Sequence, residues 1–358
     1  MHKWIVIVTE RNVWPAKHGC DARIVQLIRG YQKCGFRVCL VGTQHSTIGL
    51  AEHLVDDLLI TGGPSWDWYQ DIDKFDAGWF FGGILEAMKK HDVAAVQVEY
   101  CWMSEALEVV TEGIIKIIDT HDLMHKRAGI YDPYGILPYC RITREREAEL
   151  LNRADVILAI QDIEAEEFKS MCPDKEVVTV GHWAEGIKAC DCDENSNIVM
   201  LVGSDNPSNV MGGQVIVSQW DKVREKVPDA ELRIYGTLSD KVNEKDGIVT
   251  YGFVQNLERA YSTAKLVINP TVLGTGLKIK TVEAMAHGKA VVTTKCGADG
   301  ISGGVMVSDD LIRDIVYLLT ESSSRKEFER RALSYAMNNF SINSVLGRVV
   351  ETIKRGKK

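Results

Sequence analysis

The sequence predicts an α/β protein with two doubly wound, parallel sheets. Strand-like apolar runs alternate with amphipathic, helix-like runs through both halves of the 358-residue chain, and this alternation is typical of βαβ units. A polar stretch without periodic pattern, residues 185–197, separates the halves and is the expected linker. The stretch 269–294 has a glycine-rich turn between a strand and a helix, an arrangement found in Rossmann-like folds.

The expected strands of the first half are rich in Val, Ile and Leu, as strands buried on both faces are. They cover residues 4–10, 36–42, 93–100, 114–122, 155–160 and 176–183. Helices are expected over 21–34, 75–91, 144–154 and 163–171, and Gly35 follows the first of them as a helix-ending residue.

The second half repeats the same rhythm. Its expected strands cover residues 198–204, 231–236, 248–253, 265–270 and 290–294. Its expected helices cover residues 213–226, 257–264, 277–287, 309–320, 325–338 and 342–354. Gly288 is a suitable helix-ending residue before the last of the strands.

Composition limits the classes of function. A hydrophobic content of 45% and a charged content of 26% are those of a globular protein. The net charge of −8 argues against a large nucleic-acid footprint. We find no signal peptide and no apolar run near the roughly 18 residues that a membrane helix needs. We therefore expect a cytoplasmic protein, for which peripheral contact with a membrane stays open.

Cysteine usage gives no sign of a disulfide framework. The chain has nine cysteines and no Cys-x-x-Cys pair. Cys190 and Cys192 form the only close pair, and we expect them in a reduced loop rather than at a metal site.

The glycine turn of the second half is a candidate anion site. Gly274, Thr275 and Gly276 precede a helix whose first turn carries Lys278 and Lys280. The free N–H groups and the dipole of a helix N-terminus attract anions. Cations are disfavoured there, and a bound phosphate would resolve that conflict. The alternative is a glycine turn that serves packing alone.

Residues 274–294, GTGLKIKTVEAMAHGKAVVTT, closely resemble the donor-site segment of GT-B glycosyltransferases, in the retaining nucleotide-sugar family numbered four. Many members have two glutamates with seven residues between them. Glu283 stands at the second position, and Thr275 replaces the first. The resemblance implies that Glu283 binds the ribose and that Lys278 neutralises the diphosphate.

The resemblance also implies the domain organisation. Two Rossmann-like domains would face a central cleft. Residues 1–185 would form the acceptor domain and residues 186–340 the nucleotide-sugar donor domain. Residues 341–358 would be a helix that crosses back to the first domain, followed by a basic tail.

Other segments resemble the same family. Residues 14–42 look like its first loop and helix, with Gly19 at the first glycine of the pattern, Cys20 at the second, and Arg23 downstream. Asn206 and Asn209 stand where many members have Arg and Lys. The implied donor-binding residues are Gly19, Gly203, Ser204, Gly252, Phe253, Val254, Thr275, Gly276, Leu277, Lys278 and Glu283.

Residues 119–127 allow three interpretations. Asp119, His121, Asp122 and His125 are metal-ligand types, and the two histidines have a helical ligand spacing. His121 is alternatively a structural histidine. The family resemblance implies instead a cleft histidine near the donor sugar, with Arg127 as the basic residue downstream, and no metal.

Aromatic side chains gather in two places. Trp79, Phe80 and Phe81 lie in an apolar, helix-like run and are expected in the core. Trp66, Trp68 and Tyr69 lie in a polar loop, where they are candidates for stacking on a sugar or an acceptor. The candidate acceptor residues are therefore Arg23, Trp66, Trp68, Tyr69, Asp122 and Arg127.

Taken together, these patterns indicate a glycosyltransferase that moves a sugar from a nucleotide diphosphate sugar to a hydroxyl acceptor with retention. The acceptor would be a glycan, a lipid-linked molecule or a small molecule. The catalytic candidates are His121, Lys278 and Glu283, and we expect neither a cofactor nor a metal. The alternatives are a nucleotide-sugar epimerase or phosphorylase, a non-catalytic nucleotide-sugar or glycan-binding protein, and a glycosyltransferase that modifies nucleic acid.

Overall fold

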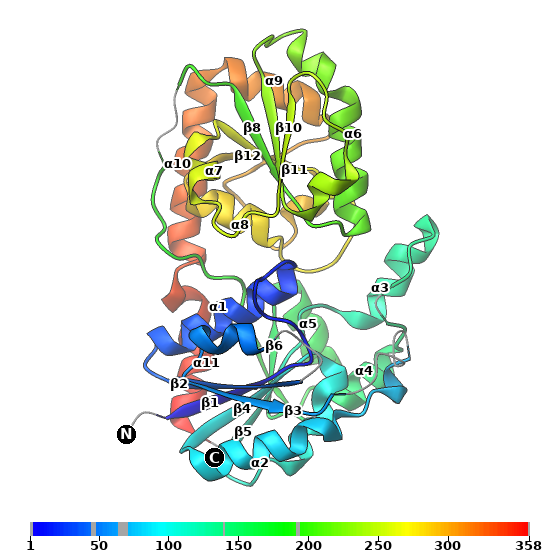
Figure 1. Ribbon diagram of the computed structural model, residues 1–358, viewed down its shortest axis with the longest axis vertical. Coiled ribbons are helices and arrows are strands. Elements are labelled where there is room, and N and C mark those ends of the chain that lie inside the picture. The colour runs from blue at the N-terminus through cyan, green and yellow to red at the C-terminus, as the bar shows by residue number, and fades with distance from the viewer. Residues whose placement is uncertain (1–2, 44–47, 64–70, 139, 191–193, 357–358) are drawn as a thin grey trace. The chain divides into compact units, whose positions relative to one another are not determined.

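The computed structural model describes residues 3–43, 48–63, 71–138, 140–190 and 194–356 (Figure 1). The chain divides into two compact units. One comprises Met1–Gly181 together with Val345–Lys358, and the other comprises His182–Ser344. The divisions expected from the sequence, after residues 185 and 340, lie a few residues away. Each unit contains one parallel sheet with helices packed against it, so the predicted α/β architecture is confirmed.

The first unit has a seven-stranded sheet in the order β3-β2-β1-β4-β5-β6-β7. Its strands are β1 (Trp4–Val8), β2 (Arg37–Thr43), β3 (Asp57–Thr61), β4 (Val93–Glu99), β5 (Ile115–Asp119), β6 (Val156–Ala159) and β7 (Glu176–Thr179). The direction of winding reverses between β1 and β4. Ligands of such sheets bind beside this point, at the carboxyl ends of the strands.

The helices of the first unit are α1 (Gly19–Lys33), α2 (Phe81–Lys90), α3 (Met124–Tyr131), α4 (Arg144–Leu151), α5 (Asp162–Met171) and α11 (Ile342–Arg355). The start of α1 is set by a capping contact, because the N–H of His18 donates to Asp21 Oδ2 at 3.1 Å. Gly35, with φ of 91°, follows its end.

From Val345 onward, the C-terminal helix α11 belongs to the first unit although it follows the second in sequence. Its apolar stripe is buried, including Leu346, Val349 and Ile353. Thr352 Oγ1 donates a hydrogen bond of 2.7 Å to Glu176 Oε1 of β7. The helix therefore fastens the end of the chain to the sheet of the first unit.

The second unit has a six-stranded sheet in the order β10-β9-β8-β11-β12-β13. Its strands are β8 (Ile198–Val202), β9 (Glu231–Tyr235), β10 (Ile248–Gly252), β11 (Leu266–Asn269), β12 (Ala290–Thr293) and β13 (Met306–Val307). Its helices are α6 (Pro207–Arg224), α7 (Glu258–Thr263), α8 (Ile279–Ala286), α9 (Leu311–Thr320) and α10 (Ser322–Asn339). The edge strands β3 and β13 are not predicted from the sequence, because neither is buried enough to show a long apolar run.

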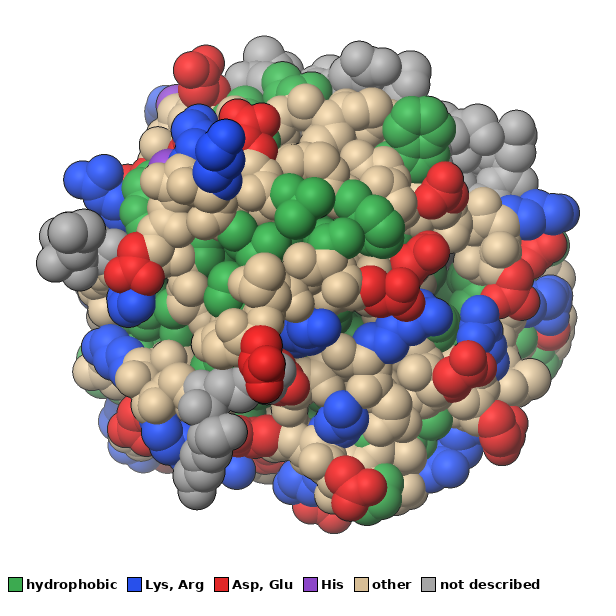
Figure 2. Space-filling view, turned by 90° about the horizontal axis from the view of Figure 1, so that it is seen from below, with side chains coloured by type: hydrophobic (Ala, Val, Ile, Leu, Met, Phe, Trp, Pro, Cys, Tyr) green, Lys and Arg blue, Asp and Glu red, His purple; other side chains and the backbone are tan. Residues whose placement is uncertain are grey.

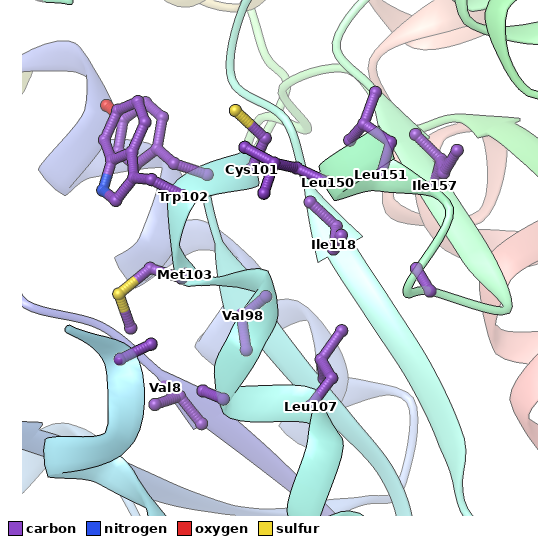
Figure 3. Close-up of a cluster of buried hydrophobic side chains, with 14 of the residues drawn as sticks. Val8, Val98, Cys101, Trp102, Met103, Leu107, Ile118, Leu150, Leu151 and Ile157 are labelled. Carbon is purple, nitrogen blue, oxygen red and sulfur yellow. The ribbon is translucent and has the colours of Figure 1, made fainter. Parts of the chain in front are cut away.

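Each unit has its own hydrophobic core. In the first unit, Val8, Val98 and Ile118 of the three central strands pack with Met103 and Leu107 of the 3-10 helix η5 (Cys101–Val109), as Figure 3 shows. On the surface, acidic and basic side chains are interspersed around a group of apolar side chains on the face shown in Figure 2.

The predicted core position of Trp79 is wrong. Residues Ala77–Phe80 form a separate 3-10 turn, η4, before α2 begins, which changes the direction of the side chains. Phe80 is fully buried, whereas 48% of Trp79 is exposed. The indole lies against Gly62, where an added Cβ would come within 2.7 Å of the ring.

Candidate functional site

Two carboxylates lie side by side at the carboxyl ends of β4 and β5. Glu99 and Asp119 are paired in register on these neighbouring strands, and both are fully buried. Arg23 of α1 donates from Nε and Nη2 to the two carboxylate oxygens of Asp119, each at 2.6 Å. The third nitrogen of the guanidinium, Nη1, donates to the carbonyl of Gly181 at 3.1 Å. The Arg23 side chain thus holds Asp119, and its contact with an acceptor stays a prediction.

His121 completes this cluster. Its Nε2 lies 2.7 Å from Glu99 Oε2 and 3.5 Å from Asp119 Oδ2. The other oxygen of Glu99 accepts a hydrogen bond of 2.7 Å from Gln97 Nε2, and Gln97 Oε1 accepts one of 2.7 Å from the hydroxyl of Tyr31. A continuous chain of hydrogen bonds therefore runs from α1 through β4 to His121.

The backbone around His121 is strained. Tyr100 and His121, with φ of 71° and 59°, are the non-glycine residues in the left-handed region within the described part of the chain. Their rings stack at 4.1 Å, and Trp102 stacks on the other face of Tyr100 at 4.3 Å. Such strain of about 1–3 kcal/mol per residue persists only where the surroundings impose it, and it is common at functional sites.

The two carboxyl groups differ in their titration. Burial disfavours the charge on Asp119, but Arg23 and His121 outweigh burial and hold its pKa below the usual range. Burial raises the pKa of Glu99, and the neighbouring charge of Asp119 adds to this rise against the hydrogen bonds from His121 and Gln97. Asp119 is therefore the charged partner of Arg23, and Glu99 is the carboxyl group of the pair whose charge burial disfavours more.

The structure does not bring together the four metal-ligand candidates of residues 119–125. His125 Nδ1 lies 2.6 Å from Glu147, which also accepts the N–H groups of Met124 and His125 at the start of α3. Asp122 is paired with Arg127. The histidine spacing is not a helical ligand pair, because α3 begins only at Met124.

Two other groups of side chains are compatible with a metal ion in their ligand types. Glu99, Asp119 and His121 offer atoms within 4.8 Å of one another, as do Cys39, Asp57 and His91. In the first group, Arg23 occupies both oxygens of Asp119. In the second, Lys90 Nζ binds Asp57 at 3.0 Å, and burial raises the pKa of the Cys39 thiol to about 12. These cations and the protonated thiol oppose metal binding.

In the second unit, the side chain of Lys278 folds back onto the glycine turn that precedes it. The helix α8 begins at Ile279, so Lys278 occupies the N-cap position rather than the first turn. Its ammonium donates to the carbonyls of Thr275 and Gly276 at 2.9 and 2.7 Å and lies 3.8 Å from Asp299. In this structure Lys278 therefore stabilises the turn.

Lys280 differs from Lys278 in having no carboxylate partner among the described residues. Its Nζ donates to Asn209 Oδ1 of α6 at 2.5 Å, and in the described part of the chain no carboxylate lies within ion-pair distance of it. Burial, and then the charge of Lys278, lower the pKa of Lys280 to about 7. An anion placed beside α8 would compensate this lysine and raise its pKa.

Glu283 lies further along α8. The hydroxyl of Tyr261 is 3.5 Å from its Oε2, and His182 Nε2 is 3.9 Å from its Oε1. Burial raises the pKa of Glu283 to about 7, against the contact with Tyr261. His287 stacks on Tyr261 at 4.2 Å and donates from Nδ1 to the Glu283 carbonyl at 2.7 Å.

Glycines at the carboxyl ends of β8, β9 and β10 bring these loops close together. The N–H of Gly203 donates to the Tyr235 carbonyl, and the N–H of Gly236 donates to that of Gly252, at 3.0 and 2.7 Å. A Cβ on Gly236 would lie 2.2 Å from the carbonyl oxygen of Gly203. Beside them, Phe253 is exposed and Val254 is half-buried.

The predicted site residues divide between the units. Gly19, Arg23, His121, Asp122 and Arg127 belong to the first unit, and Gly19 is the first residue of α1. The candidates in the second unit are Gly203, Ser204, Gly252, Phe253, Val254, Thr275, Gly276, Leu277, Lys278 and Glu283. Trp66, Trp68 and Tyr69 lie outside the described residues. Their roles as donor, acceptor or catalytic residues stay predictions.

Sequence reasoning missed Gln97 and Glu99. A signal was present, because both are polar residues within the otherwise apolar run VAAVQVEY. Buried polar residues are rare in a central strand and need partners.

Comparison with known proteins supports the architecture. The solved structure of a sucrose-phosphate synthase from Thermosynechococcus elongatus is 12% identical and superposes with a TM-score of 0.75 over 99% of both chains. Anabaena HepE, in complex with UDP and glucose, is 13% identical with a TM-score of 0.70, over 99% of this chain and all of that one. Pneumococcal O-GlcNAc transferase GtfA, in complex with UDP and GlcNAc, is 10% identical with a TM-score of 0.68 over 99% of both chains.

The fold is GT-B. Within it, residues 196–321 of the second unit match the family described as Glycosyl transferases group 1. A curated Klebsiella pneumoniae protein, described as a 44.6 kDa protein in the cps region, is 24% identical over 178 residues, which are 43% of this chain and 45% of that protein. The match thus spans less than half of that relative. Within the described residues of the GT-B chain, no helix is long and apolar enough to cross a membrane.

Proposed function

We propose that the protein is a glycosyltransferase that transfers a sugar from a nucleoside diphosphate sugar to a hydroxyl acceptor, with retention at the anomeric carbon. The observation that carries the proposal is Lys280, a lysine without a carboxylate partner, beside the glycine turn at the start of α8. It lies within the stretch that matches the Glycosyl transferases group 1 family. A cation and free helix N–H groups in one place favour a diphosphate.

The second unit would hold the donor. The N–H groups at the start of α8 and Lys280 would bind the diphosphate, while Lys278 keeps the turn closed over Thr275 and Gly276. Glu283 would accept hydrogen bonds from the ribose hydroxyls. Gly252, Phe253 and Val254 would contact the base edge. UDP is the nucleotide to test first, because it is present in the HepE and GtfA complexes.

Sugar transfer requires mainly electrostatic stabilisation of the charges that develop in the transition state. Cleavage of the sugar–phosphate bond leaves negative charge on the diphosphate and positive charge on the sugar ring. Preorganised N–H groups and an ammonium stabilise the leaving group without rearranging during the reaction. In a front-face transfer the leaving phosphate oxygen accepts the proton of the acceptor hydroxyl, so no free carboxylate nucleophile is required.

The first unit would supply His121 as a hydrogen-bonding partner of a sugar hydroxyl. Glu99 and Asp119 lie at its Nε2 edge and hold the ring in place, and Arg23 in turn holds Asp119. Asp122 and Arg127, paired with each other just beyond β5, remain candidates for acceptor contacts.

The proposal is tested by binding and turnover. Calorimetric titration with UDP and with UDP-glucose, followed by acceptor screening with NMR of the anomeric product, would show binding, transfer and retained configuration. Binding without transfer to any acceptor would favour a nucleotide-sugar-binding protein. An inverted product would overturn the retaining mechanism, and the absence of any nucleotide binding would overturn the proposed function itself.

A further inference from the structure

We propose that Glu99 is a positioning residue that fixes the tautomer of His121, so that Nδ1 meets a substrate hydroxyl as a hydrogen-bond acceptor. The role of the ring in transfer rests on the proposed function above. The tautomer itself is a property of the free protein and is testable without any substrate.

The first step of the argument is the direction of each hydrogen bond. The Tyr31 hydroxyl donates to Gln97 Oε1, which leaves the Gln97 amide N–H to donate to Glu99 Oε1. Asp119 cannot donate, because its two oxygens accept from Arg23. Glu99 thus has one donor on Oε1, and the second oxygen lies 2.7 Å from His121 Nε2. Burial raises the pKa of Glu99, but the hydrogen bonds from His121 and Gln97 favour its ionised form. A carboxylate only accepts, so the proton of the ring lies on Nε2.

The second step concerns the opposite side of the ring. In the part of the chain that the structure describes, Nδ1 of His121 makes no hydrogen bond. With the proton on Nε2, Nδ1 presents a lone pair and accepts from a hydroxyl. Such a nitrogen orients a sugar hydroxyl without adding a fixed positive charge near the sugar ring.

The third step is the rigidity of the ring. Tyr100 stacks on His121 at 4.1 Å, and the strained φ angles of both residues place the two rings face to face. Asp119 of β5 and the buried Glu10 after β1 face His121. Arg11, Cys20 of α1 and Arg127 of α3 face Tyr100. The stack leaves the ring little freedom to turn, so the proton position is set by Glu99.

Glu99→Gln is the matched change. The new amide keeps the shape of the side chain, and its oxygen accepts from Gln97 as before. Its NH₂ group then faces Nε2 and donates to it, which forces the proton onto Nδ1. The equivalent change in the orienting carboxylate of a Ser-His-Asp triad gives the wrong tautomer and a loss of about 10⁴-fold.

The experiment is ¹⁵N NMR of histidine-labelled protein, with His121→Gln used to assign the signals. Above the pH at which the ring becomes neutral, we expect the native protein to carry the proton on Nε2 and Glu99→Gln to carry it on Nδ1. Turnover with UDP-glucose should fall by about 10²-fold or more in Glu99→Gln, while the melting temperature and UDP affinity stay close to native. Glu112→Gln, an exposed change in the same unit, is the control.

A native ring with its proton on Nδ1 would overturn the inference without need of any variant. So would a Glu99→Gln protein that keeps native turnover. If the native protein shows the Nε2–H form but never transfers a sugar, the proposed function fails while the tautomer assignment stands. If Glu99→Gln does not fold, the spectrum of the native protein decides alone.

Discussion

Lys280 Nζ of α8 donates to Asn209 Oδ1 of α6 at 2.5 Å, and this neutral amide is the only partner that the described residues provide for it. Asn209 stands where the resembling family often has a cation. The amide of Asn209 in α6 therefore orients the ammonium of Lys280 in α8.

Lys280→Met is expected to weaken UDP binding by about 10- to 100-fold, because a charge-assisted hydrogen bond to a phosphate is worth about 1.5–3 kcal/mol. Isothermal titration calorimetry measures the effect.

Lys278→Met is the informative comparison. Since its ammonium holds the carbonyls of Thr275 and Gly276, this variant should also lower the melting temperature. Native UDP affinity in a folded Lys280→Met protein would remove Lys280 from the site.

At pH 8, we expect the protein to take up protons from the solvent when it binds the donor. With a pKa of about 7, Lys280 is mostly neutral there, and a nearby diphosphate raises that pKa and charges it. Uptake should approach about one proton per UDP-glucose at pH 8 and be small at pH 6, where the lysine is already charged. Affinity should therefore fall as pH rises above 7, by at most about tenfold per unit.

The measurement is calorimetry in two buffers of different ionisation enthalpy. UDP-glucose is the suitable ligand, since its diphosphate does not titrate near neutrality. Lys278, Cys296 and, beyond them, Asp299 face Lys280, and Glu283 titrates in the same range. Lys280→Met should abolish the uptake and Glu283→Gln should retain it. If the Lys280→Met protein still takes up a proton when it binds UDP-glucose, another group must be the one that is protonated.

Glu283→Gln should weaken nucleotide binding through the ribose. The lost contacts are expected to cost about 1–3 kcal/mol. Comparing UDP with its 2′,3′-dideoxy analogue isolates the effect: the native protein should prefer UDP, and the variant should lose most of that preference. Equal discrimination by both proteins would contradict a ribose contact.

Activity should survive exhaustive chelation. Arg23 already occupies Asp119, and under the proposed function Lys280 and the helix N–H groups would supply the charge that a metal would provide. Turnover is measured before and after EDTA treatment, with each divalent ion added back in turn. Loss of activity that one ion restores would instead point to Glu99, Asp119 and His121 as ligands.

Gly236→Ala should destabilise the protein by about 2 kcal/mol or more. Its φ is 91°, and an added Cβ would collide with the Gly203 carbonyl oxygen. Thermal unfolding measures the loss. Gly347→Ala in α11 is the control, because no atom lies within 4 Å of its added Cβ. It should be neutral or slightly stabilising, and an equal loss in both variants would contradict the argument from Gly236.

The sequence by itself determined the α/β class, most of the strands and helices, and the glycine turn before α8. These are local features, in which a period of two or 3.6 residues and a glycine or proline at a boundary report directly on backbone structure. The segment around Glu283 could be recognised for the same reason, since its glycines, lysines and glutamate lie within one short stretch.

Tertiary structure decided which side chains meet. The assignment of the diphosphate to Lys278 stays a prediction, but only the fold shows that this ammonium donates to its own loop and that Lys280 lies beside Asn209, 71 positions away. One of the three interpretations of residues 119–127 joined His121 with His125, whereas strand register places His121 against Glu99 of β4. Spacing along a chain carries no information about neighbours on other strands. Those contacts arise from the order of strands in the sheet and from burial, which forces each charged group to find a partner in space.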